Sequence, residues 1–428
     1  MNCIFTICAT NYIGLAKILG NSIKEFYNDF EFYIIVADEP KFDVRNSFDS
    51  NILIAKDILG YDESKWYEMA FKYDITEFCT SIKPKTLLYM LSKGFDKVIY
   101  FDPDIMFFSS VAPIFDALDN YSAVVTPHLL TSEEYSTGAL KERYLLHSGV
   151  FNLGFVALKK NTKVRRILTW WSKRLEDCCF NSSSEPFFTD QKWMDLLPCF
   201  LGNDLFISSS KGMNMAPWNF HERKVIRQDE NLIVGNRILS QENKDKLVFV
   251  HFSGFKYKDL VTGNINRIDS YSFDKYPDLD VLFELYANQL KKGDFNEYIN
   301  NEYSYNCFNN SSFKVNGFVR RLYRAYKEQY DYSENPFSEK SYFYKVCLQN
   351  KLIKKDVIAK PLKYADIKSS QTHILGLINI VLTVVFRVVG IEKYRTMLKA
   401  FKVYSEDENH YFLIKKKKQL FSVFRAKY

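Results

Sequence analysis

The chain has 428 residues, of which 47% are hydrophobic and 17% aromatic, so it carries enough apolar surface for a large core and is not globally disordered. Residues 351–428 hold 17 Lys and Arg against 6 Asp and Glu, whereas the remainder holds 41 against 45, so the net charge of +7 belongs to the C-terminal end. A nearly neutral body argues against a nucleic-acid-binding domain, and no nucleic acid is expected as a partner. The length predicts two or three folding units.

Residues 1–260 alternate strand-like and helix-like segments. Apolar runs rich in branched and aromatic side chains predict strands at 2–10, 30–38, 98–101, 122–128 and 151–158. Apolar residues at helical spacing predict helices at 11–26, 82–95 and 163–178. This alternation predicts an α/β, Rossmann-like domain, whose mainly parallel sheet is flanked by helices and whose binding sites lie beyond the carboxyl ends of the strands.

The pattern changes near residue 261. Segments 276–293 and 318–330 are helical and a polar stretch separates them, which predicts an α-helical appendage over residues 261–345. Residues 346–428 form a last part that contains one strongly apolar segment and the basic tail.

The segment VIYFDPDIMFF holds two aspartates directly after a predicted strand. Asp102 and Asp104 are two residues apart, so their carboxylates can converge on one divalent cation together with phosphate oxygens. Mg²⁺ and Mn²⁺ favour such oxygen ligands. Most Asp-x-Asp triplets are ordinary turn or surface acids, and the position after an interior strand is what favours a cation site here.

A later apolar run, KLVFV, is followed by HFSGFK. His251 would add an imidazole to the two carboxylates, a combination that accepts Mn²⁺ readily. Gly254 permits close approach of the backbone, and Lys256 can pair with a phosphate. The alternative interpretation of His251 is a histidine that caps a strand end.

The motifs occur in an order that resembles a known group of enzymes. ICATNY, IKPKTLLYML, YFDPD, FNLGF, DQKWMDLLP, NMAPWNFHER and HFSG follow one another as in the GT-A-fold glycosyltransferases, especially family 8 and its bacterial relatives, which include glycogenin and lipooligosaccharide galactosyltransferases. The resemblance covers residues 1–260. It implies a GT-A fold and a metal-dependent hexosyltransferase. The expected donor is a nucleotide diphosphate sugar, specifically a UDP-sugar, and the hexose would pass with retention to a bacterial surface glycan or a lipid-linked acceptor.

Carried over residue by residue, the resemblance implies a nucleotide-sugar site with a cation. The loop that would hold the base and ribose consists of Ala9, Thr10, Asn11 and Tyr12. Lys83 would contact the phosphates or the sugar, although an exposed helix lysine fits the sequence equally well. The metal ligands for Mn²⁺ or Mg²⁺ would be Asp102, Asp104 and His251.

The resemblance also implies a sugar side of the site. Asn152 and Gly154 of FNLGF would lie beside the donor sugar, and the alternative for Gly154 is tight strand packing. Asp190 and Gln191 of TDQKW would be the catalytic pair that stabilises an oxocarbenium-like transition state, either with a nucleophile or by positioning and electrostatics alone. Asp190 could instead be an ordinary acid at a helix N-terminus. Asn214 matches a sugar-side or acceptor-side asparagine.

Segment 214–223, NMAPWNFHER, is dense in polar and aromatic side chains. Trp218, His221, Glu222 and Arg223 can build an acceptor surface, because aromatic faces stack on sugars and Arg binds hydroxyls or phosphate. They can equally form a buried hydrogen-bond cluster that holds the loop.

Two features depart from the family pattern. Pro103 occupies the middle of the Asp-x-Asp, and FKYKDL replaces the usual Lys-Pro-Trp run, so Lys256 is less secure as a phosphate ligand than His251 is as a metal ligand. The alternative enzyme is a metal-dependent sugar nucleotidyltransferase. Those enzymes usually carry a glycine-rich, basic loop after the first strand, and the loop here, ATNYIG, disfavours this alternative. A second alternative is a non-catalytic, membrane-associated protein that binds a glycan or a nucleotide.

The C-terminal part raises the question of a membrane. Residues 374–390 are apolar except for a polar stripe of Asn379, Thr383 and Arg387, and the tail KKKKQLFSVFRAK follows. This combination predicts a helix at an anionic membrane surface, and the alternative is a helix packed on the protein's own core. Scattered cysteines and the lack of a recognisable signal peptide predict a cytoplasmic protein, peripheral on the inner face of the membrane.

Overall fold

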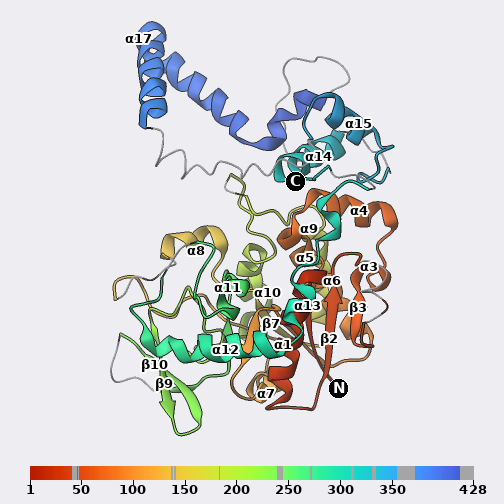
Figure 1. The fold of residues 1–428 in the computed structure, drawn as a ribbon, viewed down its shortest axis with the longest axis vertical. Helices are drawn as coiled ribbons and strands as arrows, with labels where there is room; N and C mark the ends of the chain where they lie inside the picture. Colours follow the sequence, from red (N-terminus) through yellow and green to blue (C-terminus); the bar gives the residue numbers. More distant parts are fainter. Residues whose placement is uncertain are drawn as a thin grey trace. The chain divides into compact units, whose positions relative to one another are not determined.

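The computed structural model describes residues 1–40, 46, 48–135, 138, 141–182, 184–238, 244–269, 272–309, 313–329, 334–353 and 372–414. The chain forms two compact units that alternate along the sequence (Figure 1). Unit 1 consists of Met1–Asp62 and Ile75–Ser304, and unit 2 of Glu63–Asp74 and Tyr305–Tyr428. The functional division expected at residues 260 and 345 stays a prediction.

A central sheet organises unit 1. Within the described residues it has seven strands in the order β3-β2-β1-β4-β7-β6-β8. β7 runs antiparallel to β4 and β6, and the other neighbours are parallel. The strands are β1 (Asn2–Cys8), β2 (Glu31–Val36), β3 (Ile52–Ile54), β4 (Lys97–Phe101), β6 (Ala123–Val125), β7 (Phe155–Lys159) and β8 (Leu205–Ile207). The predicted α/β class with a mainly parallel sheet flanked by helices is therefore confirmed, as is the helical C-terminal part.

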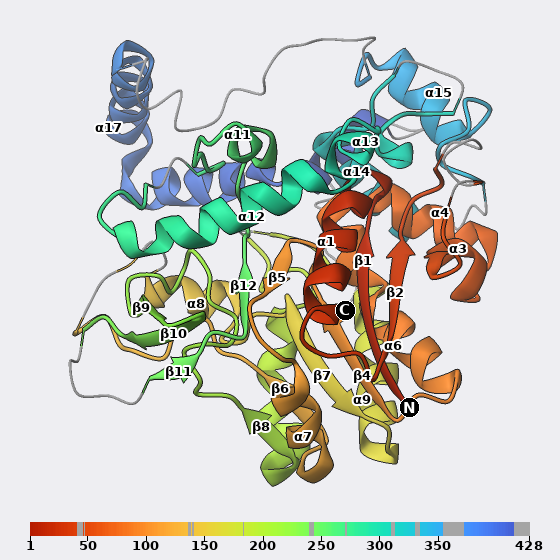
Figure 2. The ribbon, with the colours of Figure 1, turned by 60° about the horizontal axis from the view of Figure 1, so that its bottom comes forward.

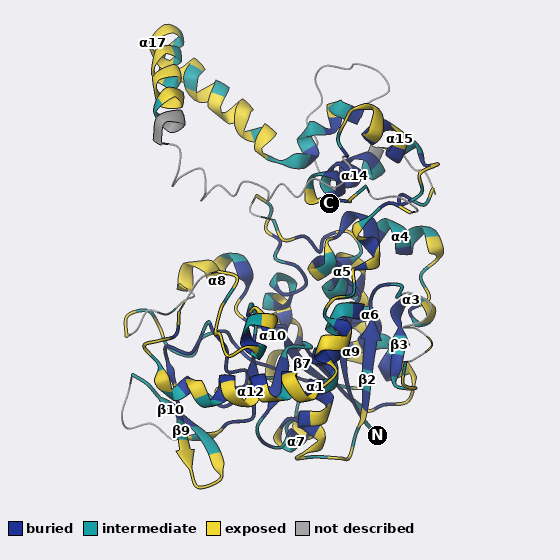
Figure 3. Ribbon diagram, in the orientation of Figure 1, coloured by how far each residue is buried: buried dark blue, intermediate teal, exposed yellow. Residues whose placement is uncertain are grey.

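Helices cover the sheet because their apolar faces match its buried strands (Figures 2 and 3). The helices of unit 1 are α1 (Ile13–Lys24), α3 (Ala55–Ile58), α5 (Ile75–Ser81), α6 (Lys83–Ser92), α7 (Ala112–Asn120), α8 (Glu142–Ser148), α9 (Thr162–Leu175), α10 (Leu197–Leu201), α11 (Tyr257–Val261), α12 (Asp280–Lys292) and α13 (Phe295–Tyr298). Short 3₁₀ turns, among them η1 (Thr10–Tyr12) and η2 (Lys192–Leu196), join some of them. The strands are mostly apolar, and polar side chains such as Asp38 and Asp102 follow just after β2 and β4, where a site can form.

The strand ends are extended by a small ribbon. β5 (Ile105–Phe107) pairs antiparallel with β12 (Phe249–His251), in a register that sets His251 opposite Ile105. Beside it, β9 (Arg223–Gln228), β10 (Asn231–Asn236) and β11 (Asp245–Lys246) form a separate antiparallel sheet. Because Asp104 immediately precedes β5, the ribbon brings His251 next to the aspartates.

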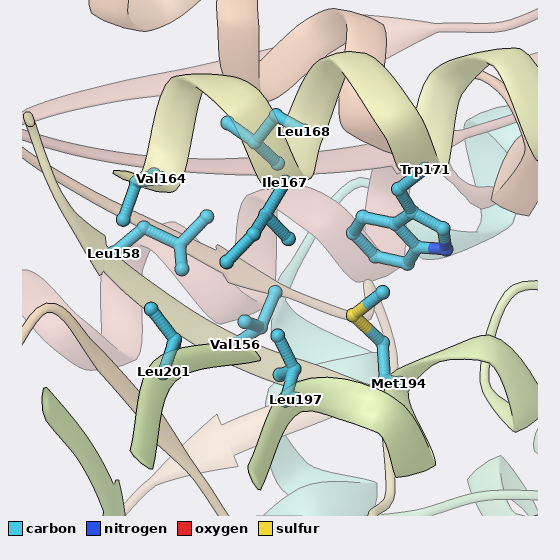
Figure 4. Close-up of a pocket in the computed structure, with 9 residues that line it drawn as sticks. All are labelled: Val156, Leu158, Val164, Ile167, Leu168, Trp171, Met194, Leu197 and Leu201. Atoms are coloured by element: carbon cyan, nitrogen blue, oxygen red, sulfur yellow. The ribbon is translucent and has the colours of Figure 1, made fainter. Parts of the chain in front are cut away.

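A small apolar void lies where α9 packs on β7 and α10 (Figure 4). Its lining is entirely apolar apart from the indole nitrogen of Trp171, and it consists of Val156, Leu158, Val164, Ile167, Leu168, Trp171, Met194, Leu197 and Leu201. Trp171 Nε1 donates to the backbone carbonyl of Asp190 at 3.2 Å. This packing therefore has a structural role, since it anchors the segment that carries Asp190.

Unit 2 joins an early helix to the C-terminal part of the chain. It contains α4 (Glu63–Lys72), α14 (Gly317–Gln329), α15 (Tyr342–Gln349), α17 (Thr372–Lys402), η6 (Val403–Ser405) and η7 (Asp407–Ile414). Arg320 of α14 is buried, and its guanidinium contacts the carbonyls of Ala70, Phe71 and Tyr73 at 3.0, 2.9 and 2.7 Å. These contacts satisfy carbonyls at the end of α4 that have no partner within the helix.

The predicted apolar segment forms the first half of α17. The helix is kinked at Gly390, which has φ +76°. Large apolar side chains of α17 are exposed, among them Leu377, Ile378, Ile380, Val381, Val384, Phe386, Val388 and Ile391 (Figure 3). Among the described residues, no helix is both long and apolar enough to cross a membrane. The basic tail at 415–428 lies outside the described residues.

Candidate functional site

Asp102, Asp104 and His251 come together beyond the carboxyl end of β4. One ligand atom from each lies within 4.8 Å of the other two. His251 Nε2 is 3.0 Å from Asp104 Oδ1 and 3.7 Å from Asp102 Oδ2. Two carboxylates and one imidazole are ligands that suit Mn²⁺ and accept Mg²⁺, so the donor set fits a divalent cation.

The electrostatics of the cluster follow from burial and from this proximity. Burial raises the pKa of Asp102, although the charges of Lys83 and His251 oppose the rise. Burial also acts to raise the pKa of Asp104, but the charge and hydrogen bond of His251 and the hydroxyl of Tyr257 outweigh it, so that the pKa is lowered. Burial lowers the pKa of His251, and the two aspartates more than reverse this effect, so that the pKa is raised. The lowered pKa of Asp104 and the raised pKa of His251 both follow from attraction between the carboxylates and a positive charge on the imidazole.

A tyrosine hydroxyl bonds each aspartate on the oxygen that faces away from His251. Tyr100 donates to Asp102 Oδ1 at 2.5 Å, and the hydroxyl of Tyr257 lies 2.8 Å from Asp104 Oδ2. Both tyrosines are buried. The remaining oxygens, Asp102 Oδ2 and Asp104 Oδ1, are the ones nearest His251 Nε2.

A cavity of about 410 Å³ opens beside the aspartates, within the size range of small-molecule sites. It is lined by the end of β1 and the following loop, by α5, by the segment around Asp102 and Asp104, and by the segment around His251. The lining residues are Ile7, Cys8, Ala9, Asn11, Tyr12, Ile75, Thr76, Cys79, Thr80, Tyr100, Asp102, Pro103, Asp104, His251 and Ser253. Of the predicted nucleotide loop, Ala9, Asn11 and Tyr12 therefore border this cavity.

Thr10 holds the loop rather than lining the cavity. Its backbone N–H and its hydroxyl both lie within hydrogen-bond distance of Asp38 Oδ1, at 2.8 and 2.7 Å. Asp38 follows β2, is buried, and also accepts from the N–H of Ser304 through Oδ2 at 3.2 Å. A carboxylate at the end of the second strand thus fixes the turn after the first strand.

Lys83 and Asp190 form a buried ion pair next to the ring of Tyr100. Lys83 Nζ lies 2.5 Å from Asp190 Oδ2, with the two side chains 1% and 3% exposed. The ammonium also donates to the carbonyl of Leu153 at 2.8 Å and lies 4.2 Å from the centre of the Tyr100 ring. Lys83 is therefore not an exposed helix lysine, and Asp190 is fully engaged, since its Oδ1 is 3.2 Å from the hydroxyl of Thr189.

Gln191 also bonds through both ends of its amide. Its Nε2 donates to the carbonyl of Ser148 at 2.6 Å, and its Oε1 accepts from the N–H of Leu153 at 3.2 Å. Gln191 thus ties the end of α8 to the turn before β7.

Asn152, Gly154 and Asn214 belong to a buried polar network next to the Asp102–Asp104–His251 cluster. Asn214 has φ +54° and donates through Nδ2 to Thr126 Oγ1 at 2.8 Å and to Asn152 Oδ1 at 3.0 Å. Its buried Oδ1 has no hydrogen-bond partner among the described residues. The carbonyl of Gly154 accepts from the N–H of Asp102 at 2.8 Å, and a Cβ at Gly154 would lie 2.5 Å from the His251 ring. Gly154 therefore allows the His251 ring to approach closely, and Asn214 is fully buried and does not line the cavity.

Segment 214–223 is mainly a buried hydrogen-bond cluster. Glu222 and Arg223 are each 1% exposed. Glu222 accepts from the N–H of Leu130, while Arg223 donates to the carbonyls of Lys211 and Met213 at 3.0 and 2.8 Å. Trp218 is only partly buried and its ring lies 5.2 Å from His251, edge to face. Of the two interpretations left open, the structure favours the structural one for Glu222 and Arg223.

Gly254 and Lys256 do not border this cavity. Gly254 has φ +75°, where glycine is favoured, and packs near the guanidinium of Arg267. Lys256 is exposed at the start of α11. The close backbone approach predicted at Gly254 and the phosphate contact predicted for Lys256 stay predictions.

Several site residues have no signal in the sequence. Cys79 and Thr80 enter the cavity from α5, and Tyr257 reaches Asp104 from α11, both by tertiary packing alone. Asp38 is the last residue of the strand predicted at 30–38, so its position at a strand end was a signal for a site residue, as it is for Asp102. His128 lies in the polar network, with Nε2 3.4 Å from Asn152 Nδ2.

Comparison with known proteins finds distant relatives. No protein-family model matches the chain. YfnF and YfnD of Bacillus subtilis (strain 168), both described as uncharacterized, are 24% and 26% identical over 289 and 295 residues. Each match covers 67% of this chain, and 90% and 88% of the respective relative.

Among solved structures, the chain is similar to a galactosyltransferase LgtC in complex with donor and acceptor sugar analogs, at a TM-score of 0.38 and 15% identity over 67% of this chain and 95% of that one. It is also similar to mouse xyloside xylosyltransferase 1, at a TM-score of 0.31 and 10% identity over 50% and 88% of the two chains. With TM-scores below 0.5, the function has to be supported by the site of this chain.

Proposed function

We propose that the chain is a GT-A-fold, metal-dependent glycosyltransferase related to family 8, which transfers a hexose from a nucleotide diphosphate sugar. The observation that carries the proposal is the Asp102–Asp104–His251 cluster at the edge of a cavity large enough for a nucleotide. A UDP-sugar is the proposed donor, with its nucleoside against the β1 loop and its diphosphate toward the aspartates. The proposed acceptor is a bacterial surface glycan or a lipid-linked sugar.

Mn²⁺, or Mg²⁺ in its place, would be held by Asp102, Asp104 and His251 and would neutralise charge on the departing diphosphate. The network of Asn152, Asn214 and Gln191 would then border the sugar. Asn214 Oδ1 is buried and lacks a partner among the described residues, so a sugar hydroxyl that reached it would find an unpaired acceptor. This supports a polar sugar subsite beside the cation.

For the retaining reaction we favour transfer on one face of the sugar without a covalent intermediate at Asp190. Both oxygens of Asp190 are engaged, one by Lys83 and one by Thr189, in a buried pair. A carboxylate held in this way is suited to fixing Lys83 and the surrounding segment, and less suited to attacking carbon. The group would therefore contribute positioning and electrostatics.

A panel of sugar nucleotides, incubated with and without Mn²⁺, tests the activity. One donor is expected to release nucleoside diphosphate in a Mn²⁺-dependent reaction, and Asp104→Ala is expected to abolish it. A parallel incubation with a nucleoside triphosphate and a sugar 1-phosphate tests the alternative, because a sugar nucleotidyltransferase would join them and release pyrophosphate. Metal-independent turnover, or no turnover of any donor, would overturn the proposal.

We also propose that α17 binds an anionic membrane surface, where a lipid-linked acceptor would lie. The five most exposed large apolar residues of the helix before the kink at Gly390 are spaced so that they share one face, and they are Leu377, Ile380, Val381, Val384 and Val388. Beyond the kink, the helix carries four basic residues and one acidic residue, Glu392. The basic residues are Lys393, Arg395, Lys399 and Lys402. An apolar face followed by basic residues suits an anionic lipid surface.

Substitution tests this surface better than truncation, because η7 downstream of α17 holds structural contacts, such as Glu408 with Arg324 at 2.9 Å. Leu377→Ser/Val384→Ser/Val388→Ser is expected to lose binding to vesicles that contain anionic lipid. Leu146→Ser/Leu285→Ser/Leu348→Ser, at exposed apolar positions outside α17, is the matched control. Equal vesicle binding by both triple variants would remove α17 from the proposal.

A further inference from the structure

Within the described residues, two tyrosine hydroxyls, and not a partner of His251, hold the side chains of the proposed cation site in place. A metal-bound histidine normally donates its second ring N–H to a carboxylate or carbonyl, which fixes the ring. His251 Nδ1 is buried and has no such partner among the residues that the structure describes. The orienting hydrogen bonds fall instead on the two carboxylates, from Tyr100 and Tyr257.

Each tyrosine is itself fixed by its surroundings. The Tyr100 ring lies beneath the Lys83 ammonium, at 4.2 Å, and Lys83 is paired with Asp190. Tyr257 meets the ring of Tyr12 edge to face at 5.9 Å, and its hydroxyl is also 2.9 Å from the carbonyl of Phe252. Rotation of either tyrosine would therefore break buried contacts, so the two hydroxyls are held in place.

We propose that Tyr100 and Tyr257 are positioning residues of the cation site, each occupying one oxygen of one aspartate so that Asp102 and Asp104 present a single oxygen each. The inference rests on the cation site of the proposed function. Its consequence is selectivity. A hydrogen bond on one oxygen of an aspartate competes with chelation through both oxygens. This disfavours Ca²⁺, a cation that readily accepts bidentate carboxylates, relative to the smaller Mn²⁺ or Mg²⁺. It also leaves coordination positions for the donor's diphosphate.

The test measures binding of Mn²⁺ itself to the full-length protein without donor, by electron paramagnetic resonance, with Ca²⁺ as competitor. Tyr257→Phe and Tyr100→Phe are each expected to raise the Kd for Mn²⁺ by about 10-fold or more. The Kd for Ca²⁺ should change less, so that the preference for Mn²⁺ narrows. A role in packing alone would not change this ratio of affinities.

Tyr286→Phe is the matched control. Its hydroxyl is buried with no hydrogen-bond partner among the described residues, and its ring stacks on Phe252 at 3.9 Å, close to Tyr257. It should bind Mn²⁺ as the wild type does. If Tyr100→Phe does not fold, Tyr257→Phe decides.

The outcomes separate the two proposals. Wild type that fails to bind Mn²⁺ overturns the cation site and the positioning role together. Wild type that binds Mn²⁺, with Tyr257→Phe unchanged in both Kd and Ca²⁺ competition, overturns only the positioning role. The same is concluded if Tyr286→Phe loses as much affinity as Tyr257→Phe.

Discussion

The space around Gly154 is too small for even one added carbon atom. A Cβ there would meet His251 Cε1 at 2.5 Å and Asn152 Oδ1 at 2.9 Å, closer than real contacts allow. Gly154→Ala is therefore expected to push the imidazole away from the aspartates and to weaken Mn²⁺ binding at least 10-fold. Calorimetric titration with Mn²⁺ checks this. Gly317→Ala is the matched control, because Gly317, like Gly154, has no positive φ, and the space around its Cβ position is open. Unchanged Mn²⁺ affinity in Gly154→Ala would contradict the contact.

Substitution of Asp190 could abolish activity either by removing a chemical role or by destabilising the fold, because Asp190 pairs with the buried Lys83. Measuring the free energy of unfolding separates the two explanations. Asp190→Asn leaves the Lys83 charge buried without its counter-ion, which is expected to lower the free energy of unfolding by about 3–5 kcal/mol. Lys83→Met/Asp190→Leu removes both charges and should recover most of that loss in a denaturant titration. Recovery of stability without activity would assign a chemical role to the pair. A double variant as unstable as Asp190→Asn would contradict the pairing.

His128 gives the polar network a pH dependence. Burial lowers its pKa from 6.5 to about 4, so the folded protein keeps it neutral, with Nδ1 3.1 Å from the Val150 carbonyl. The unfolded chain takes up the proton first as pH falls. Stability from this residue is therefore complete above pH 6.5 and is lost between pH 6.5 and about 4, by about 3 kcal/mol.

Urea titrations of wild type and His128→Gln across this range measure that loss. Glutamine does not titrate, so the difference in unfolding free energy between the two proteins should shift in favour of the variant as pH falls. Parallel pH profiles would contradict the neutral state of His128.

At the scale of elements, the β5–β12 ribbon decides whether the site exists. A slip of one residue would turn His251 to the opposite face. The register is held by an aromatic cluster in which the Phe249 ring lies 5.3 Å from Phe101 and from Phe107, and 5.5 Å from Phe155.

Phe249→Ala is expected to lower the free energy of unfolding by about 3–5 kcal/mol and to weaken Mn²⁺ binding, although Phe249 touches no proposed ligand. Phe249→Leu, which keeps most of the volume, should lose less of both. Thermal unfolding with and without Mn²⁺ measures the two effects. A variant that loses stability but retains wild-type Mn²⁺ affinity would show that the register has another support.

These elements also mark how far the sequence could lead. Asp102 and His251 were predictable because each stands at or just past the end of an apolar run. The pairing of β5 with β12 was not, since it joins segments more than a hundred residues apart and both read simply as apolar. Lys83 had two equally consistent interpretations, because its burial against Asp190 depends on tertiary packing across 107 residues. Tyr257 belongs to a short helix whose pattern contains no sign of a carboxylate partner.

At the scale of the whole molecule, the interleaved units limit where the chain can be cut. Phe71 of α4 is buried and its ring lies 4.7 Å from Tyr323 and 4.8 Å from Phe337, both in unit 2. Deletion of residues 305–428 is therefore expected to expose α4 and give a protein that binds a hydrophobic dye and aggregates.

The same deletion with residues 63–74 replaced by a short Gly-Ser linker should be more soluble, because it removes the exposed apolar face as well. Soluble yield and dye fluorescence compare the two proteins. Equal behaviour would contradict the assignment of α4 to unit 2.

The interleaving has a consequence for synthesis. Trp66 of α4 donates its indole N–H to the hydroxyl of Tyr305, 239 positions later in the chain. At about 5–20 residues per second, α4 leaves the ribosome roughly 12–48 s before its partner exists. Throughout that interval its tryptophan, methionine and phenylalanine side chains have no native surface to cover them. The nascent protein is therefore most exposed to misassembly and to chaperone capture while the later strands of the central sheet are being translated.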